Sequence, residues 1–317
     1  MKSIVGGKRF HRFILGLLLS SSAVAVTAVA APTYSLILIN QQATYFNQMR
    51  EGAQKQADKL GAKLVVFNAN DAPSAQNNAM DDYTQQKVNG IAVDAIDVNG
   101  LRASIKAATD AGIPVVGIDA VLPPGPQKAQ VGVDNAVGGG MIADFTTAYV
   151  KRQLGGKARI GVIGALSSTI QNARLKAAVG QWSKTPGISI AGTVDGRNSQ
   201  DVALAAAENL ITANPDLNII YATGEPAMLG AIAAINAQGM NQKIKVVGWD
   251  LAAEVIRGLD SGVVLGVVQQ DPAAIGAASI QALDDIQHGK PVQPVITVPV
   301  AIVTKAGVDP YRAQFRK

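Results

Sequence analysis

Two carboxylates in this chain occupy equivalent places at the ends of two similar apolar runs. Asp119 ends the run VVGID, and Asp250 ends the run VVGWD. In an open parallel α/β sheet, ligands bind outside the carboxyl ends of the strands, so both aspartates are candidates for a binding site. An ionised carboxylate can accept two hydrogen bonds from adjacent hydroxyl groups. Each aspartate alone could simply cap the next helix, but the matched pair favours binding of a hydroxyl-rich small molecule.

Further polar residues end five other strand-like runs of the chain. These are Asn40, Asn68, Asp94, Glu225 and the pair Gln269–Gln270. Because the carboxyl ends of parallel strands lie at one edge of a sheet, such residues can line one pocket. Arg174, on a predicted helix in the second half of the chain, is a candidate donor to the same ligand.

Aromatic residues are scarce, at 4%, yet several lie beside these strand ends. Tyr45 and Phe46 begin the first predicted helix, where their flat faces could pack on the C–H face of a sugar. The alternative for one of the two is an anchor in the core. Trp249 precedes Asp250 directly, and both a core role and a binding role remain open for it.

The residues of common catalytic and metal sites are missing from the sequence. There is no cysteine, and the only histidine beyond the first 30 residues is His288, in a polar stretch. No nucleophile elbow and no phosphate-binding P-loop is present. The run 138–140 of three glycines lacks dinucleotide-binding spacing, and a calcium loop starting at Asp97 has alanine where a glutamate is needed. We therefore expect no catalytic residues, no metal and no cofactor.

Regular alternation of apolar runs and amphipathic stretches defines the fold class. Strands are predicted over residues 35–39, 63–67, 90–93, 114–118, 129–133, 158–163, 189–194, 218–221, 245–248 and 263–268. Helices are predicted over residues 45–60, 74–87, 99–111, 136–154, 169–183, 199–213, 227–238, 252–259 and 272–288. The strands read as continuously apolar, which is typical of parallel strands covered on both faces. This pattern predicts an α/β protein built from parallel sheets.

The strand and helix series occurs twice, over residues 34–119 and again over residues 158–250. The duplication predicts two doubly wound lobes joined by a hinge. The segment PPGPQKAQVG, residues 123–132, is the best linker by composition because prolines and glycines punctuate it.

Residues 1–30 have the organisation of a secretory signal peptide. Four cations and no acid precede an apolar run, and Ala28-Val29-Ala30 supplies a cleavage site, with cleavage expected after Ala30. A membrane anchor is the alternative. These four cations account for most of the formal charge of +5, so the remainder is nearly neutral and offers no basic patch for nucleic acid. Export without disulfides fits the periplasm.

The chain resembles the type I periplasmic sugar-binding proteins of ABC transporters, in particular the ribose-binding branch. The resemblance rests on segments that include GAQKQADKLGAKLVV, AGIPVVGID, VGVDNAVGGGMIADF, KVVGWD and VVQQDPAAIG. It implies a monomeric, non-enzymatic carrier whose two lobes close around a monosaccharide or polyol and present it to an inner-membrane ABC permease. We place the first lobe at residues 31–133 with 271–297, and the second at residues 134–270 with 298–317.

Carried over by position, the family's ligand contacts fall on Asn40, Tyr45, Phe46, Asp119, Arg174, Asn198, Asp250 and Gln270. Several positions depart from the ribose pattern. Ala120 stands where an arginine is expected, and Ala43 and Gly224 where asparagines are expected. Asn198 stands where an aromatic residue would cover the sugar from the second lobe. These changes leave another pentose, a hexose or a linear polyol open as the ligand.

Two other roles are compatible with this architecture. A sensory binding protein would deliver the same kind of ligand to a chemoreceptor or kinase, and the sequence does not separate that role from transport. A transcriptional repressor would carry a basic helix-turn-helix before the first strand, whereas only about three residues separate Ala30 from that strand.

Overall fold

The computed structural model describes residues 1–3, 6, 30–41 and 44–315. Two units are distinguished, Met1–Ala31 and Pro32–Lys317, and the helices and strands of the described residues lie in the second. Most of the predicted signal peptide, and Ala43, lie outside the described residues. In the described part of the chain, no helix is long and apolar enough to cross a membrane.

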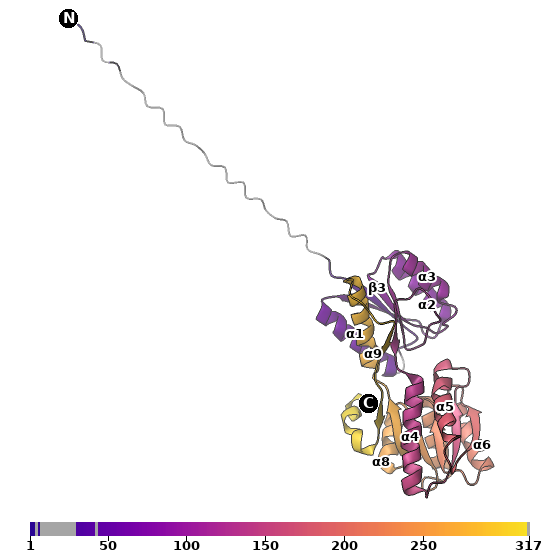
Figure 1. Cartoon of the computed structure of the whole chain (residues 1–317). Coiled ribbons are helices and arrows are strands. Elements are labelled where there is room, and N and C mark those ends of the chain that lie inside the picture. The colour runs from indigo at the N-terminus through magenta and orange to yellow at the C-terminus, as the bar shows by residue number, and fades with distance from the viewer. Residues whose placement is uncertain (4–5, 7–29, 42–43, 316–317) are drawn as a thin grey trace. The chain divides into compact units, whose positions relative to one another are not determined.

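A first sheet contains six parallel strands in the order β11-β5-β4-β3-β1-β2. Its strands are β1 (Thr33–Leu38), β2 (Lys63–Asn68), β3 (Gly90–Asp94), β4 (Val115–Ile118), β5 (Ala129–Gly132) and β11 (Val295–Thr297). The helices that follow in the chain are α1 (Thr44–Leu60), α2 (Pro73–Gln85) and α3 (Arg102–Asp110), with α9 (Pro272–Gln287) added from the far end of the sequence (Figure 1).

A second sheet repeats this arrangement in the order β12-β10-β9-β8-β6-β7, with only the short β12 antiparallel. Its strands are β6 (Ala158–Gly164), β7 (Ile188–Asp195), β8 (Ile219–Ala222), β9 (Lys245–Trp249), β10 (Val264–Gln269) and β12 (Ala301–Val303). Its helices are α4 (Asn135–Gln153), α5 (Thr169–Trp182), α6 (Gln200–Ala213), α7 (Glu225–Ala237) and α8 (Ala253–Ser261). The 3-10 turns η1 (Lys305–Gly307) and η2 (Asp309–Phe315) follow β12.

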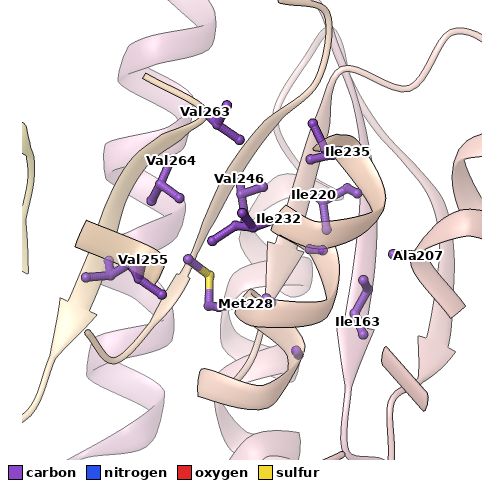
Figure 2. Packing of buried hydrophobic residues seen from close by; sticks show 14 of the residues in the cluster. Ile163, Ala207, Ile220, Met228, Ile232, Ile235, Val246, Val255, Val263 and Val264 are labelled. Atoms are coloured by element: carbon purple, nitrogen blue, oxygen red, sulfur yellow. The ribbon is translucent and has the colours of Figure 1, made fainter. Parts of the chain in front are cut away.

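Helices cover both faces of each sheet because alternate strand residues point to opposite sides. In β8, Ile220 faces a cluster formed with α6, α7 and α8, while Ile219 and Tyr221 face α4 and α5. Figure 2 shows part of the first of these clusters, where Val246 lies beside Met228 and Ile232 of α7. The expected doubly wound α/β fold, with two parallel-sheet lobes, is therefore confirmed.

The chain passes between the two sheets three times. It does so between β5 and α4, between β10 and α9, and between β11 and β12. The prediction of a linker over residues 123–132 is wrong in its second half. Residues Ala129–Gly132 form β5, which pairs with β4 on one side and β11 on the other. The prolines and glycine at residues 123–126 favoured a linker by composition. The apolar run at 129–133 correctly indicated a strand.

Helix α9 packs closely on α1, which attaches it to the first sheet although it follows β10. Gly52 and Gly276 make this possible, because a side chain on either would overlap backbone atoms of the other helix. Tight contact between these helices holds the crossing that follows Gln270 close to the start of α1.

Candidate functional site

A cavity of about 300 Å³ is lined by residues of both sheets at the carboxyl ends of their strands. This volume is at the lower end of the range for small-molecule sites. The cavity brings together seven of the eight predicted site residues: Tyr45, Phe46, Asp119, Arg174, Asn198, Asp250 and Gln270. They come from positions spread over more than two hundred residues of sequence, and the parallel topology collects them.

The two aspartates that end VVGID and VVGWD have the same local structure. Asp119 has a φ of 55° and Asp250 a φ of 67°, both in the left-handed region that residues other than glycine rarely adopt. The backbone N–H of each still donates to the neighbouring strand, Asp119 to Val131 O and Asp250 to Val268 O, both at 2.9 Å. The left-handed turn thus ends each strand while directing both carboxylates to the cavity. Such strained positions are often found at binding sites.

A line of polar contacts joins the two carboxylates across the cavity. The Tyr45 hydroxyl donates to Asp119 Oδ1 at 2.9 Å and lies 3.5 Å from Gln270 Oε1. The Gln270 amide donates to both carboxylate oxygens of Asp250, at 3.0 and 3.1 Å. Asp119 and Asp250 therefore converge on one site, with Tyr45 and Gln270 between them.

Arg174 is held in place by the second sheet and its helices. Its Nε donates to Asn135 Oδ1 at 2.8 Å, and its Nη1 donates to Thr223 O at 3.0 Å. The guanidinium carbon lies 3.8 Å from the centroid of the Trp249 ring, a cation–π arrangement. Nη1 is also 3.8 Å from Asp250 Oδ2. The arginine is consequently fixed beside a carboxylate, with no hydrogen bond from Nη2 to any described residue.

Trp249 itself is fully buried, and its Nε1 donates to the Tyr221 hydroxyl at 3.1 Å. It is a core residue that positions Arg174. Gly138 of α4 lies against the tryptophan ring so closely that a β-carbon there would overlap it, and Gly139 approaches the backbone of Arg174 equally closely. Gly138 and Gly139 therefore serve close packing behind the site.

The cavity contains more acidic than basic groups, and burial perturbs them. The pKa of Asp119 is raised by burial, an effect opposed by the hydrogen bond from Tyr45 and by Arg174. The pKa of Asp250 is raised by burial and lowered in part by Arg174 and Gln270. Burial also raises the pKa of Glu225 to about 7, with Asp250 and Glu254 adding to the shift.

Asp94 is completely buried at the end of β3, and it does not belong to the described residues that line the cavity. Burial raises its pKa well above the ordinary value, and the charge of Asp119 adds to the rise. It lies near enough to Asp119 and Tyr45 to influence both electrostatically. Asp94 therefore influences the site electrostatically without lining the cavity.

Gln171 is one of the lining residues that were absent from the predicted set of ligand contacts. The Gln171 amide donates to Asn198 Oδ1 at 2.8 Å and accepts from the Thr223 hydroxyl at 2.6 Å. It also fills the space beside Gly224, where a β-carbon would lie 3.1 Å from its Nε2. Its position three residues before Arg174, on the same face of a helix, is the signal that could have identified it.

Asn40 is the predicted contact that the structure does not bring to the cavity. Its side chain donates to Asp71 Oδ1 at 3.1 Å, and its predecessor Ile39 is the lining residue from this strand end. His288 is likewise remote from the described lining residues and lies at the end of α9, with Nδ1 2.8 Å from Asp284 O.

A family profile described as "periplasmic binding protein domain" matches residues 34–291. Among curated proteins, the ribose import binding protein of Bacillus subtilis (strain 168) is 28% identical over 265 residues, covering 82% of this chain and 83% of the relative. The D-allose-binding periplasmic protein of Escherichia coli (strain K12) is 25% identical over 301 residues, covering 92% of this chain and 94% of the relative.

Solved structures share the fold at lower sequence identity. A carbohydrate transporter solute-binding protein from Agrobacterium radiobacter, in complex with D-arabinose, superposes with a TM-score of 0.80 at 24% identity, covering 91% of this chain and 100% of that one. A sugar-binding protein of a sugar ABC transporter from Bacillus halodurans gives a TM-score of 0.82 at 23% identity, covering 88% and 99%.

Proposed function

The chain belongs to the family of periplasmic binding proteins, and we propose that it carries a monosaccharide or polyol to an ABC permease in the inner membrane. Its curated relatives include ribose and allose carriers that match nearly their whole length. They are binding proteins, so the chain is a periplasmic binding protein and not an enzyme. We further propose that it acts as a monomer.

The main support for a carbohydrate ligand is the convergence of two carboxylates at one cavity. Asp119 and Asp250 are distant in sequence but meet at one cavity, linked through Tyr45 and Gln270. Carboxylates and amides in this arrangement can each bond a different hydroxyl of one small ligand. Tyr45 and Phe46, whose rings meet edge to face at 5.3 Å, offer an apolar surface for the C–H groups. This combination suits a sugar or polyol better than a purely apolar or purely ionic ligand.

We propose Tyr45, Phe46, Asp119, Arg174, Asn198, Asp250 and Gln270 as ligand contacts, with Gln171 added from the structure. Asn40, whose side chain bonds Asp71 in this structure, also remains a proposed contact. The lobes that close on the ligand are residues 31–133 with 271–297 and residues 134–270 with 298–317. Each of the three crossings between the sheets lies at a boundary of this division.

A thermal-shift screen of the purified protein against D-ribose, D-allose, D-arabinose and xylitol tests the function. At a ligand concentration one hundred times Kd, binding stabilises a protein by about 2.7 kcal/mol, which gives a clear rise in Tm. Asp250→Ala should abolish that rise while unfolding remains cooperative. Stabilisation by amino acids or nucleobases, with no response to any sugar or polyol, would contradict the proposal.

We also propose that residues 1–30 form a signal peptide that is removed on export. The four cations, the apolar run and the Ala-Val-Ala ending support this proposal. N-terminal sequencing of protein recovered from the periplasm should begin at Ala31, within a few residues. Recovery of the full-length chain in the membrane fraction would instead support an anchor.

A further inference from the structure

The last described residue of the chain, Phe315, lies at the ligand cavity. It lines the same cavity as Tyr45, Phe46 and the two strand-end aspartates. Its ring is partly buried and packs against the apolar cluster on one face of the second sheet. The far end of the sequence therefore reaches the site that the strand ends form.

The segment that carries Phe315 is held firmly to the second sheet's helices. Arg312 of η2 donates to both carboxylate oxygens of Asp260, at 2.9 and 2.7 Å, and to Asp309 Oδ1 at 2.7 Å. Lys305 donates to the Asp260 carbonyl at 2.7 Å, and Val308 is fully buried. The two-point arginine–carboxylate contact fixes orientation as well as position. Phe315 is thus presented by an anchored turn.

The same segment also touches the first lobe beside the cavity. The Gln48 amide of α1 donates to Gln314 Oε1 at 3.2 Å. Gln48 and Thr44, both on α1, line the cavity together with Phe315. The end of η2 therefore lies where residues of the two sheets meet around the ligand space.

Asn198, a cavity-lining residue of the second lobe, offers an amide and no aromatic surface. The other described lining residues of this lobe, Phe315 apart, are polar, aliphatic or proline residues. The aromatic surface at the cavity otherwise comes from α1 alone, through Tyr45 and Phe46. A sugar ring bound between two lobes exposes two faces, and only one of them could pack on α1.

We propose that Phe315 is a further ligand-contact residue, which supplies aromatic surface to the cavity from the second lobe. A ring presents a continuous C–H face to an aromatic side chain, whereas an open-chain polyol does not hold such a face in place. Phe315 therefore favours cyclic sugars over linear polyols. This inference rests on the proposed carbohydrate function and narrows it.

Isothermal titration of the exported protein with D-ribose, D-allose, D-arabinose and xylitol tests the inference. Phe315→Leu keeps an apolar side chain for the core but removes the flat ring. We expect it to raise the Kd for the bound cyclic sugar about tenfold, while Tm without ligand changes little. Phe315→Tyr, which keeps the ring, should retain the affinity within about threefold.

Tyr311→Ala is the matched control. Tyr311 lies in the same turn and packs on the same apolar cluster, but it is not a lining residue of this cavity. We expect this variant to lower Tm and to leave the Kd within about threefold of the unchanged protein. Equal Kd values for Phe315→Leu and the unchanged protein, or equal losses in Phe315→Leu and Tyr311→Ala, would overturn the inference.

This titration distinguishes failure of the proposed carbohydrate binding from failure of the role assigned to Phe315. If the unchanged protein binds no sugar or polyol, the proposed function is wrong and the inference falls with it. If it binds a sugar that Phe315→Leu binds equally well, only the role of Phe315 is wrong. A larger loss for xylitol than for the cyclic sugars would overturn the selectivity assigned to the ring.

Discussion

Among the described residues that line the ligand cavity, three carboxylates face a single cation. Arg174 is the only basic residue among the described lining residues, which include Asp119, Glu225 and Asp250. It forms an ion pair with Asp250, at 3.8 Å, and its charge also lowers the pKa of Asp119 from farther away. The residue after Asp119 is Ala120 and not the expected arginine, so no cation lies next to this aspartate in the sequence. Its carboxylate instead accepts a hydrogen bond from the neutral Tyr45 hydroxyl. The acid excess explains why burial raises the carboxyl pKa values here without full compensation.

Glu225 provides a test of this acid excess through the pH dependence of stability. Its pKa is about 7 in the folded protein, against 4.5 ordinarily, because of burial and the charges of Asp250 and Glu254. The folded state then binds more protons than the unfolded state between these values, so the free energy of unfolding falls as pH rises from about 4.5 to about 7. Each unit of pKa shift contributes about 1.4 kcal/mol.

Urea unfolding of the unchanged protein and of Glu225→Gln across this pH range measures the effect. The variant should lose less stability as pH rises, because its amide does not titrate. The contribution of Glu225 is complete below the unfolded-state pKa and is lost by the folded-state pKa, so both profiles should run parallel above that range. Parallel profiles throughout would show that Glu225 is not perturbed.

Helix α4 influences the site although none of its described residues lines the cavity. Its glycines let the helix approach Trp249 and the backbone of Arg174. Gly138→Ala should displace the tryptophan ring and with it the guanidinium. We expect a loss of about 1–3 kcal/mol in unfolding free energy, as overpacking typically causes, together with weaker ligand binding.

Gly140→Ala is the matched control on the same helix. A β-carbon there would meet nothing nearer than Gln181 Oε1, at 3.9 Å. Alanine also has the higher helix propensity, so this variant should be as stable as the unchanged protein or slightly more stable. Chemical denaturation and calorimetric titration of both variants make the comparison. Equal effects of the two substitutions would mean that the Trp249 contact is unimportant.

Most helices and strands could be predicted from the sequence, because continuous apolar runs and helical periodicity are local signals. Every predicted strand coincides with an observed one to within two residues, whereas β11 and β12 were missed. Each of these has three residues and is only partly buried, so its pairing is set by the neighbouring strand and not by its own pattern.

The site was predictable where strand ends and resemblance agreed, as for Asp119 and Asp250. Gln171 and Phe315 were not, because neither ends a strand. Gln171 reaches the cavity by helix face, and Phe315 reaches it through a turn held by Arg312. Such positions depend on tertiary contacts between segments remote in sequence, which local patterns do not encode.

Exposed apolar side chains between the two lobes predict that closure of the lobes contributes to ligand affinity. A second cavity adjoins the first and draws residues from both lobes, including Val121 and Val295 from one and Ile170 from the other. Val121 and Val295 are exposed, at 59% and 66%. Closing the lobes on a ligand would bury these side chains, so part of the affinity should come from apolar burial. Titrations at several temperatures should therefore give a negative heat-capacity change of binding.

Val121→Lys tests this coupling without touching the proposed ligand contacts. A lysine is tolerated while position 121 faces solvent, but closure of the lobes would desolvate it, and burying an unpaired charge is costly. Because the apparent affinity falls with the population of the competent state, the Kd should rise about tenfold or more. Val137→Lys is the control, since Val137 is exposed to a similar degree, at 56%, but lines neither cavity. Unchanged binding in both variants would mean that the ligand is held without closure of this surface.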